Sequence, residues 1–210
     1  MRILQVGILL MLAAVTVAAQ NPPAGQPPAG TQPPGGPGGP GGGQRRGPIQ
    51  VMTLTTAAWS DGGMIPAKHT QAGAQLSPAL SWSNVPEGTQ SFVLIARDLD
   101  AAIGNGTDDI LHWMLWNIPG ATRSLPEGLP QGAQLPDGTR QISASGPYYR
   151  GPGAPSAGPP HHYTFELYAL DEIINVPAVG QSPPLTRTAV LAAMAGRVRG
   201  KAAYVGLFKR

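Results

Sequence analysis

The sequence predicts a mostly β domain, either a sandwich or a barrel, with one helix near its C-terminus. From about Val51 onward, short apolar segments rich in Val, Ile, Trp, Phe and Tyr alternate with turn signals made of Gly and Pro. Many short strands at regular spacing are typical of all-β sandwiches and barrels. A length of 210 residues allows one such domain together with terminal extensions.

Residues 1–19 have the three-part pattern of a secretory signal peptide. Arg2 supplies an early positive charge, an apolar run follows, and Val17 and Ala19 flank a small-residue cleavage point before Gln20. The run is short for a membrane span of about 20 residues, which favours cleavage over an uncleaved anchor. We therefore expect an exported protein, periplasmic or secreted. Because the chain has no cysteine, its fold has to hold without disulfides.

Residues 20–48 are predicted to form a disordered tether, because Gly and Pro fill most of these positions and few apolar side chains can be buried. Such a composition is typical of a mixed extended and flexible linker. Arg45 and Arg46 have two interpretations, a solubilising pair or a peripheral contact with an anionic membrane surface. The globular domain then spans residues 49–210.

Charge and motif content exclude several classes of function. Charged residues make up 12% of the chain and the net charge is only +3, without a Lys/Arg stripe interleaved with aromatic residues, so we expect no nucleic-acid partner. The sequence also lacks a G-x-S-x-G nucleophile motif, an H-E-x-x-H zinc motif and a phosphate-binding G-x-x-x-x-G-K-[ST] loop. No cofactor is expected.

Six apolar segments are predicted to form the main strands, and they are separated by breakers such as Gly62, Gly63 and Pro66. They cover residues 51–59, 79–85, 91–100, 111–118, 162–170 and 202–208. Residues 186–202 have a helical composition and are predicted to form the one amphipathic helix.

Two acidic residues end the apolar face of the segment 91–100. By the period of two, Phe92, Leu94, Ala96, Asp98 and Asp100 fall on one face of a strand. Carboxylates at the edge of a core are costly unless they are paired. Two interpretations stay open: the acids cap the following loop, residues 101–109, or they belong to a binding site.

Three of the four histidines lie on predicted strands or at their starts. His112 has apolar and aromatic neighbours, so it is either a core histidine or a ligand-binding group. His161 and Tyr163 share one face of a strand that follows a Gly/Pro loop, whereas His162 points to the other face. We expect His161 and Tyr163 to point inward and His162 to point outward.

The order of these segments resembles the phosphatidylethanolamine-binding protein family, and in particular its bacterial, Raf-kinase-inhibitor-like branch. The resemblance rests on "QLSPALSWSNVPEGTQSFVLIARDLDA", then "HWMLWNIPG", then "RGPGAPSAGPPHHYTFELYAL". The family pattern joins S-P-x-L-x-W, D-P-D-A-P, H-W and G-P-x-P-P…P-H-R-Y in that order. The resemblance covers essentially the whole globular part.

Most positions of that pattern are matched. The matching residues are Ser77, Pro78, Leu80, Trp82, Asp98, Asp100, Ala101, His112, Trp113, Gly151, Pro152, Pro155, Pro160, His161 and Tyr163. Leu99 and Ala102 stand where the family usually has prolines, and Gly153 and Ala154 depart from the commonest loop residues. His162 replaces the arginine of the last motif.

The resemblance implies a Greek-key β-sandwich with a small pocket at one end, which binds phosphate, acetate or a phospholipid head group. Protonated imidazoles, a tyrosine hydroxyl and backbone N–H groups of a glycine loop are suitable donors for an anion. The expected ligand-binding residues are Asp98, Asp100, His112, Gly151, Gly153, Pro155, His161 and Tyr163, with no catalytic residue and no metal site.

The main prediction is therefore an exported, non-enzymatic binding module for a small anion, a phosphorylated ligand or a phospholipid head group. One alternative is a hydrolase that uses the same residues, either with a divalent metal or with an Asp–His pair as general base. Another is a protein-interaction module, since some members of the family inhibit kinases or proteases. The bacterial members of the family are often dimeric, so a homodimer is a further possibility.

Overall fold

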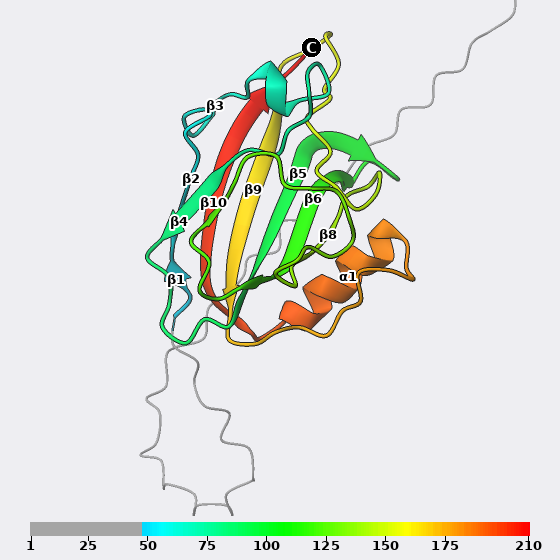
Figure 1. Ribbon diagram of the computed structural model, residues 1–210. Coiled ribbons are helices and arrows are strands. Elements are labelled where there is room, and N and C mark those ends of the chain that lie inside the picture. The colour runs from blue at the N-terminus through cyan, green and yellow to red at the C-terminus, as the bar shows by residue number, and fades with distance from the viewer. Residues whose placement is uncertain (1–47) are drawn as a thin grey trace, which may run out of the picture. The chain divides into compact units, whose positions relative to one another are not determined.

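A computed structural model describes residues 48–210, which form two β-sheets, one α-helix, α1 (Pro183–Met194), and a short 3-10 helix, η1 (Ala67–His69) (Figure 1). The predicted signal peptide, residues 1–19, and the predicted tether, residues 20–48 except for its last residue, lie outside the described part. No helix within residues 48–210 is long and apolar enough to cross a membrane.

The strands form a larger sheet of seven strands and a smaller sheet of three. The larger sheet has the order β1-β10-β9-β5-β6-β8, and β3 also pairs with β10. Its strands are β1 (Gln50–Val51), β3 (Gly63–Met64), β5 (Ser91–Ile103), β6 (Asp108–Pro119), β8 (Arg140–Ile142), β9 (His161–Leu170) and β10 (Val198–Phe208). The smaller sheet contains β2 (Thr53–Thr55), β4 (Leu80–Ser83) and β7 (Ser124–Leu125). The predicted mostly β fold with one helix near the C-terminus is confirmed.

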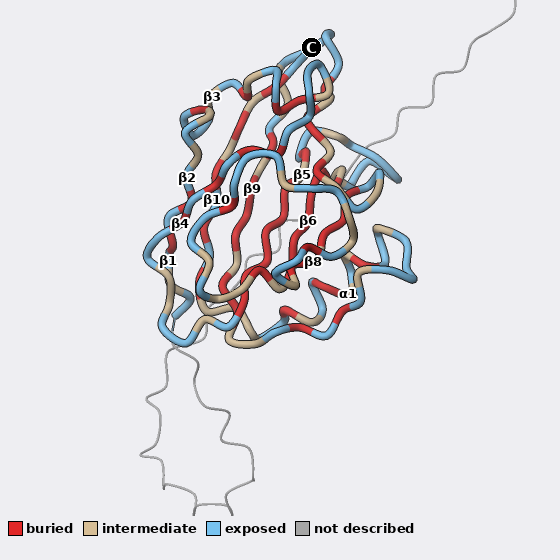
Figure 2. Tube along the Cα trace, in the orientation of Figure 1, coloured by how far each residue is buried: buried red, intermediate tan, exposed pale blue. Residues whose placement is uncertain are grey.

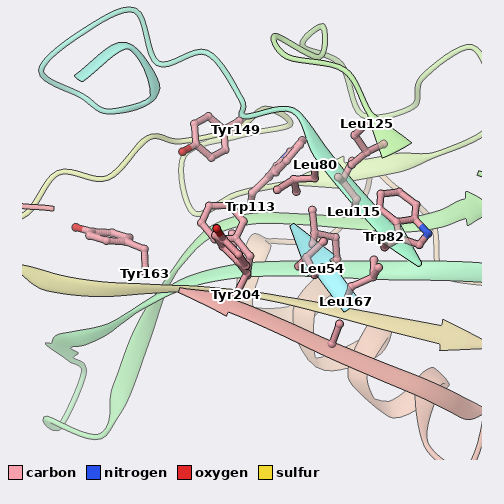
Figure 3. Packing of buried hydrophobic residues seen from close by; sticks show 14 of the residues in the cluster. Leu54, Leu80, Trp82, Trp113, Leu115, Leu125, Tyr149, Tyr163, Leu167 and Tyr204 are labelled. Carbon is pink, nitrogen blue, oxygen red and sulfur yellow. The ribbon is translucent and has the colours of Figure 1, made fainter. Parts of the chain in front are cut away.

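The main core lies between the two sheets. Leu54 and Trp82 from the smaller sheet belong to one buried cluster with Leu115 and Leu167 from the larger sheet (Figure 3). Side chains two residues apart on a strand point to the same side, so alternate residues of each strand enter this cluster. Burial of each large apolar side chain contributes about 1.5–3 kcal/mol to the free energy of unfolding.

A second core lies on the other face of the larger sheet, where helix α1 covers it. Val190 and Met194 of the helix form a buried cluster with Val93, Met114 and Trp116. Because both faces of the central strands are covered, the first six residues of β5 are all buried, and so are residues 111–116 of β6 (Figure 2).

The predicted helix, residues 186–202, was placed too far along the chain. Helix α1 begins at Pro183, which tolerates the first helical position because its missing N–H would have no partner there, and ends at Met194. Gly196 adopts a φ of 73°, a left-handed conformation that is common just after a helix. Pairing with β9 then draws Val198 and the residues after it into β10.

The predicted loop 101–109 is in fact mostly strand. β5 continues to Ile103 and β6 starts at Asp108, so only the tip of this long hairpin lies outside the strands. The register between β5 and β6 shifts after Ala96 and again after Asp98. These irregularities change which face each side chain occupies near the end of β5.

Candidate functional site

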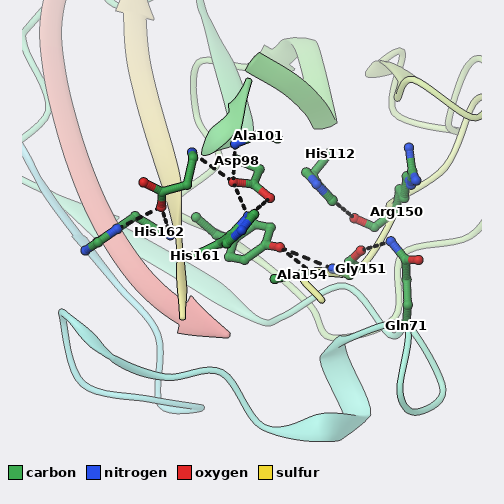
Figure 4. A network of polar contacts seen from close by, with 12 residues as sticks. Gln71, Asp98, Ala101, His112, Arg150, Gly151, Ala154, His161 and His162 are labelled. Carbon is green, nitrogen blue, oxygen red and sulfur yellow. Dashed lines mark hydrogen bonds and ion pairs between the residues drawn. The ribbon is translucent and has the colours of Figure 1, made fainter. Parts of the chain in front are cut away.

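A cluster of polar side chains lies where β5, β6 and β9 are neighbours in the larger sheet (Figure 4). β5 supplies Asp98, β6 supplies His112, and β9 supplies His161 and Tyr163. Asp98 is the register partner of Tyr163 across the antiparallel β5–β9 pair. The sheet order therefore brings together side chains that are far apart along the chain.

Asp98 is the most connected member of this cluster. Its side chain is buried, and its Oδ2 accepts a hydrogen bond from His161 Nδ1 at 2.9 Å. Its Oδ1 also accepts the backbone N–H groups of Asp100, at 3.0 Å, and Ala101, at 3.2 Å. Asp98 thus caps the turn after the paired part of β5 and holds a histidine, so both interpretations of this residue describe real contacts. These donors offset the cost of burying a carboxylate.

His161 is oriented by that contact. A carboxylate accepts hydrogen bonds, so Nδ1 of His161 carries the hydrogen that it donates to Asp98. Its Nε2 is then left for another partner, as an acceptor in the neutral ring and as a donor in the charged ring. The side chain is 20% exposed, which leaves the ring accessible from the solvent side.

His112 is held in the same way by the main chain. Its Nδ1 donates to the carbonyl of Arg150 at 2.8 Å, because a carbonyl oxygen can only accept. Its ring packs edge-on against Tyr163, with 5.0 Å between the ring centroids. Burial lowers the pKa of His112, while the Arg150 carbonyl and the charge of Asp98 oppose that effect. His112 has the burial of a core histidine and is also in contact with the cluster.

Tyr163 links the cluster to the Gly/Pro loop. Its hydroxyl oxygen accepts the backbone N–H groups of Gly153, at 3.2 Å, and Ala154, at 3.1 Å. Burial, and then the charge of Asp98, raise the pKa of this hydroxyl, so it stays neutral. The expectation that the N–H of Gly153 faces a ligand is corrected here, because that N–H is already donated to Tyr163.

The glycines of the loop allow two chain segments to approach closely. A Cβ on Gly151 would lie 2.7 Å from the carbonyl oxygen of His69, and one on Gly153 would lie 2.4 Å from Nε2 of Gln71. Gln71 fastens the loop: its Nε2 donates to the Gly151 carbonyl and its backbone N–H to the Pro152 carbonyl, both at 2.8 Å. Sequence reasoning missed Gln71, because no local pattern marks a contact across 80 residues.

Asp100 does not join the cluster, although the period of two predicted it on the face of Asp98. Its side chain is exposed and accepts hydrogen bonds from the backbone N–H of His162, at 2.5 Å, and from His162 Nδ1, at 2.8 Å. The first of these bonds lowers the pKa of Asp100 most. The prediction failed because pairing between β5 and β9 ends at Asp98 and the register between β5 and β6 shifts between Asp98 and Ile103, which interrupts the alternation of faces.

His162 and Pro155, two other positions considered in the sequence analysis, are both exposed and lie outside the cluster. The His162 side chain is 57% exposed, which confirms its predicted outward direction. Pro155 is exposed and forms no hydrogen bond with the cluster. Its place in the loop therefore adds no contact to the four central side chains.

The rim of the Gly/Pro loop carries cations that sequence reasoning also missed. Arg210 donates to Oε1 of Gln71 at 3.3 Å, and Lys209 donates to the carbonyl of Gly158 at 3.3 Å. Neither cation has a signal in the local sequence, because each contact joins parts of the chain that are at least 51 residues apart. Within residues 48–210, no three His, Asp or Glu side chains are grouped so that they could hold a metal ion.

Known proteins resemble this chain over its described part. The sequence is 40% identical over 161 residues to a UPF0098 protein of Methanothermobacter thermautotrophicus, covering 76% of this chain and 99% of that protein. It is 35% identical to a UPF0098 protein of Aquifex aeolicus, with coverage of 76% and 90%.

Solved structures agree with this similarity. A homologue from Chlamydia trachomatis, described as a putative phosphatidylethanolamine-binding protein homologue, superposes with a TM-score of 0.63 at 29% identity, covering 77% of this chain and 99% of that one. Escherichia coli YbcL gives a TM-score of 0.62 at 25% identity, with coverage of 76% and 98%. The sequence model of the phosphatidylethanolamine-binding protein family matches residues 55–209. With its two-sheet fold and the polar cluster between β5, β6 and β9, this chain belongs to the phosphatidylethanolamine-binding protein family.

Proposed function

We propose that this protein is a non-enzymatic module that binds a small anion at Asp98, His112, His161 and Tyr163. The anion is phosphate, a phosphorylated ligand or a phospholipid head group. The observation that carries the proposal is the way the two imidazoles are held. Each is tied down through Nδ1, so Nε2 of each ring remains for a ligand beside the neutral hydroxyl of Tyr163.

The chemistry of the cluster favours a negatively charged ligand when the rings are protonated. A protonated imidazole donates from Nε2, and a hydrogen bond to a charged group is stronger than one between neutral groups. The two contacts of Tyr163 with the loop use its hydroxyl oxygen as an acceptor, so its hydrogen is left to donate to Asp98 or to an anion bound beside Asp98. Lys209 and Arg210 at the rim add positive potential for an approaching anion.

Two further parts of the proposal rest on the sequence and the family. The family description names phosphatidylethanolamine, whose head group carries a phosphate, and this chemistry suits the cluster. The N-terminal pattern of residues 1–19 supports export, so the ligand is met in the periplasm or outside the cell.

A hydrolase is the second candidate, and one contact favours it. The Asp98–His161 pair, at 2.9 Å, has the arrangement of a carboxylate that orients a general base for water. Turnover of phosphate or carboxylate esters by the purified protein, lost in His161→Ala, is the result that would favour this candidate over simple binding.

Calorimetric titration with inorganic phosphate and with phosphoethanolamine tests the binding proposal. His112→Ala and His161→Ala should each weaken binding by about 10- to 100-fold, the range for loss of a hydrogen bond to a charged group. His162→Ala is the matched control: it removes the adjacent but outward imidazole and should leave affinity unchanged. Undiminished binding in both His112→Ala and His161→Ala would refute the proposed site.

A further inference from the structure

A groove separate from the polar cluster lies between the tip of the β5–β6 hairpin and helix α1. Its volume is about 670 Å³, within the range of about 300–1,000 Å³ that is usual for small-molecule sites. The groove is lined by Ile103, Thr107, Asp108, Asp109, Ile110, Leu111, Ala144, Arg150, Pro183, Pro184, Arg187, Thr188 and Leu191.

Apolar side chains face this groove from both of its walls. Ile103 of the hairpin is 46% exposed and Leu191 of the helix is 44% exposed. Leu111 and Ile110 from β6 and the ring of Pro184 continue the apolar lining. A ligand with a hydrocarbon part would remove this surface from water, which is the main favourable contribution to binding in apolar grooves.

The charged residues of the groove differ in how they are paired. Asp109 accepts hydrogen bonds from both Arg97 and Arg187, so the charge of Arg187 is already matched. Arg150 forms no ion pair with any residue between 48 and 210, and it is one of the residues that line the groove. Asp108, the remaining charge of the lining, lies exposed at the hairpin tip. Arg150 is therefore the cation that the groove can offer to a ligand.

We propose that this groove binds an anionic amphiphile, namely an aliphatic carboxylate whose chain lies against Ile103 and Leu191 and whose carboxylate pairs with Arg150. A guanidinium group presents two parallel N–H donors, a geometry that matches a carboxylate. The proposal does not depend on anion binding at the polar cluster, because the two sites use different side chains. Arg150 gives His112 its main-chain carbonyl as a hydrogen-bond acceptor, and its positive charge lowers the pKa of His112, but its guanidinium forms no hydrogen bond with the cluster.

Titration of the full chain with decanoate and with the uncharged analogue decanol tests both parts of this site. Wild type should bind decanoate at least about tenfold more tightly than decanol, because a charge-assisted hydrogen bond is lost with the alcohol. Arg150→Gln should remove this preference while binding of decanol is kept. Leu191→Glu should weaken both ligands by about tenfold or more, because it places a charge on the apolar wall.

Two controls make the outcome decisive. Leu185→Glu changes another exposed leucine of α1, 61% exposed and outside the lining, and should leave decanoate affinity unchanged. Leu191→Glu should keep a cooperative urea-unfolding transition like that of wild type, which shows that the variant is folded whether or not the polar cluster binds an anion.

Three results would overturn the proposal. They are equal affinity of wild type for decanoate and decanol, equal weakening by Leu185→Glu and Leu191→Glu, and weaker decanoate binding in Asp108→Asn, because removing a negative charge near a bound carboxylate should not weaken its binding. A solution dimer that Leu191→Glu dissociates would likewise assign the groove to a second copy of the chain.

Discussion

Asp98 explains why one residue can satisfy two interpretations of a sequence pattern. Its carboxylate has room for several donors, and in the fold it receives two from the main chain and one from His161. The turn after Asp98 and the orientation of His161 therefore depend on the same side chain. Sequence patterns identified both possibilities, but only the geometry shows that they coexist.

Tyr163 offers a direct test of the link between the cluster and the loop. In Tyr163→Phe the N–H groups of Gly153 and Ala154 lose their acceptor, and an unsatisfied buried donor costs about 1–3 kcal/mol. We expect the free energy of unfolding, measured with urea, to fall by that amount. Tyr149→Phe is the control, because it removes a single bond to the carbonyl of His69 and should cost about 1 kcal/mol. An equal effect of the two substitutions would contradict this role of Tyr163.

His112 predicts a pH dependence of stability with a definite sign. Burial lowers the pKa of His112 in the folded protein, whereas in the unfolded chain it titrates near its reference value of about 6.5. Below that pH the unfolded chain binds more protons at this residue, so its contribution to the free energy of unfolding decreases as pH falls and is complete above about pH 6.5.

The comparison of His112→Gln with His162→Gln checks that prediction. Urea unfolding between about pH 4.5 and 7.5 should show a smaller loss of stability on acidification in His112→Gln than in wild type. His162→Gln alters an exposed ring and should keep the wild-type profile. A profile for His112→Gln identical to that of wild type would show that this buried ring does not carry the effect.

At the scale of elements, the Gly/Pro loop is shaped by its contact with the segment after η1. A Cβ on Gly151 would meet main-chain atoms of His69 and Thr70, which cannot move without shifting the backbone, whereas the atoms nearest to a Cβ on Gly153 belong to the end of the Gln71 side chain. Gly151 and Gly153 are therefore required for packing of the loop, independently of any role in binding a ligand.

Alanine substitutions separate these two glycines. Gly151→Ala should lower the free energy of unfolding by about 1–3 kcal/mol, the cost of overpacking a tight contact. Gly153→Ala should cost less, because the flexible Gln71 side chain can move aside. Urea unfolding of both variants checks this order, and a larger loss in Gly153→Ala would contradict it.

At the scale of the whole molecule, the sequence correctly predicted the strands that have a clear local pattern of apolar residues. The alternating segment 162–170 became most of β9, and the apolar segment 111–118 lies entirely within β6. The helix boundary failed because pairing of β10 with β9 outweighs the helical composition of residues 197–202. Local preference cannot anticipate a strand partner that lies elsewhere in the chain.

The site residues also fall into two groups: those that sequence motifs predicted and those that depend on contacts between distant parts of the chain. Family motifs named Asp98, His112, His161 and Tyr163, and the strand order brings these four together. Asp100 was misplaced because a strict period of two does not continue beyond the end of strand pairing. Gln71 and Arg210 were missed because their contacts connect distant parts of the chain.

The most direct test of the anion-binding proposal is the pH dependence of affinity for glycerophosphoethanolamine, a phosphodiester whose own charge stays constant between about pH 5 and 8. Because an imidazole has to take up a proton before its Nε2 can donate to the anion, binding is coupled to proton uptake, and the affinity should decrease as pH rises through this range. His161→Ala should bind weakly at every pH, and His162→Ala should keep the wild-type dependence. Affinity that is the same from about pH 5 to 8 in the wild-type protein would contradict the account.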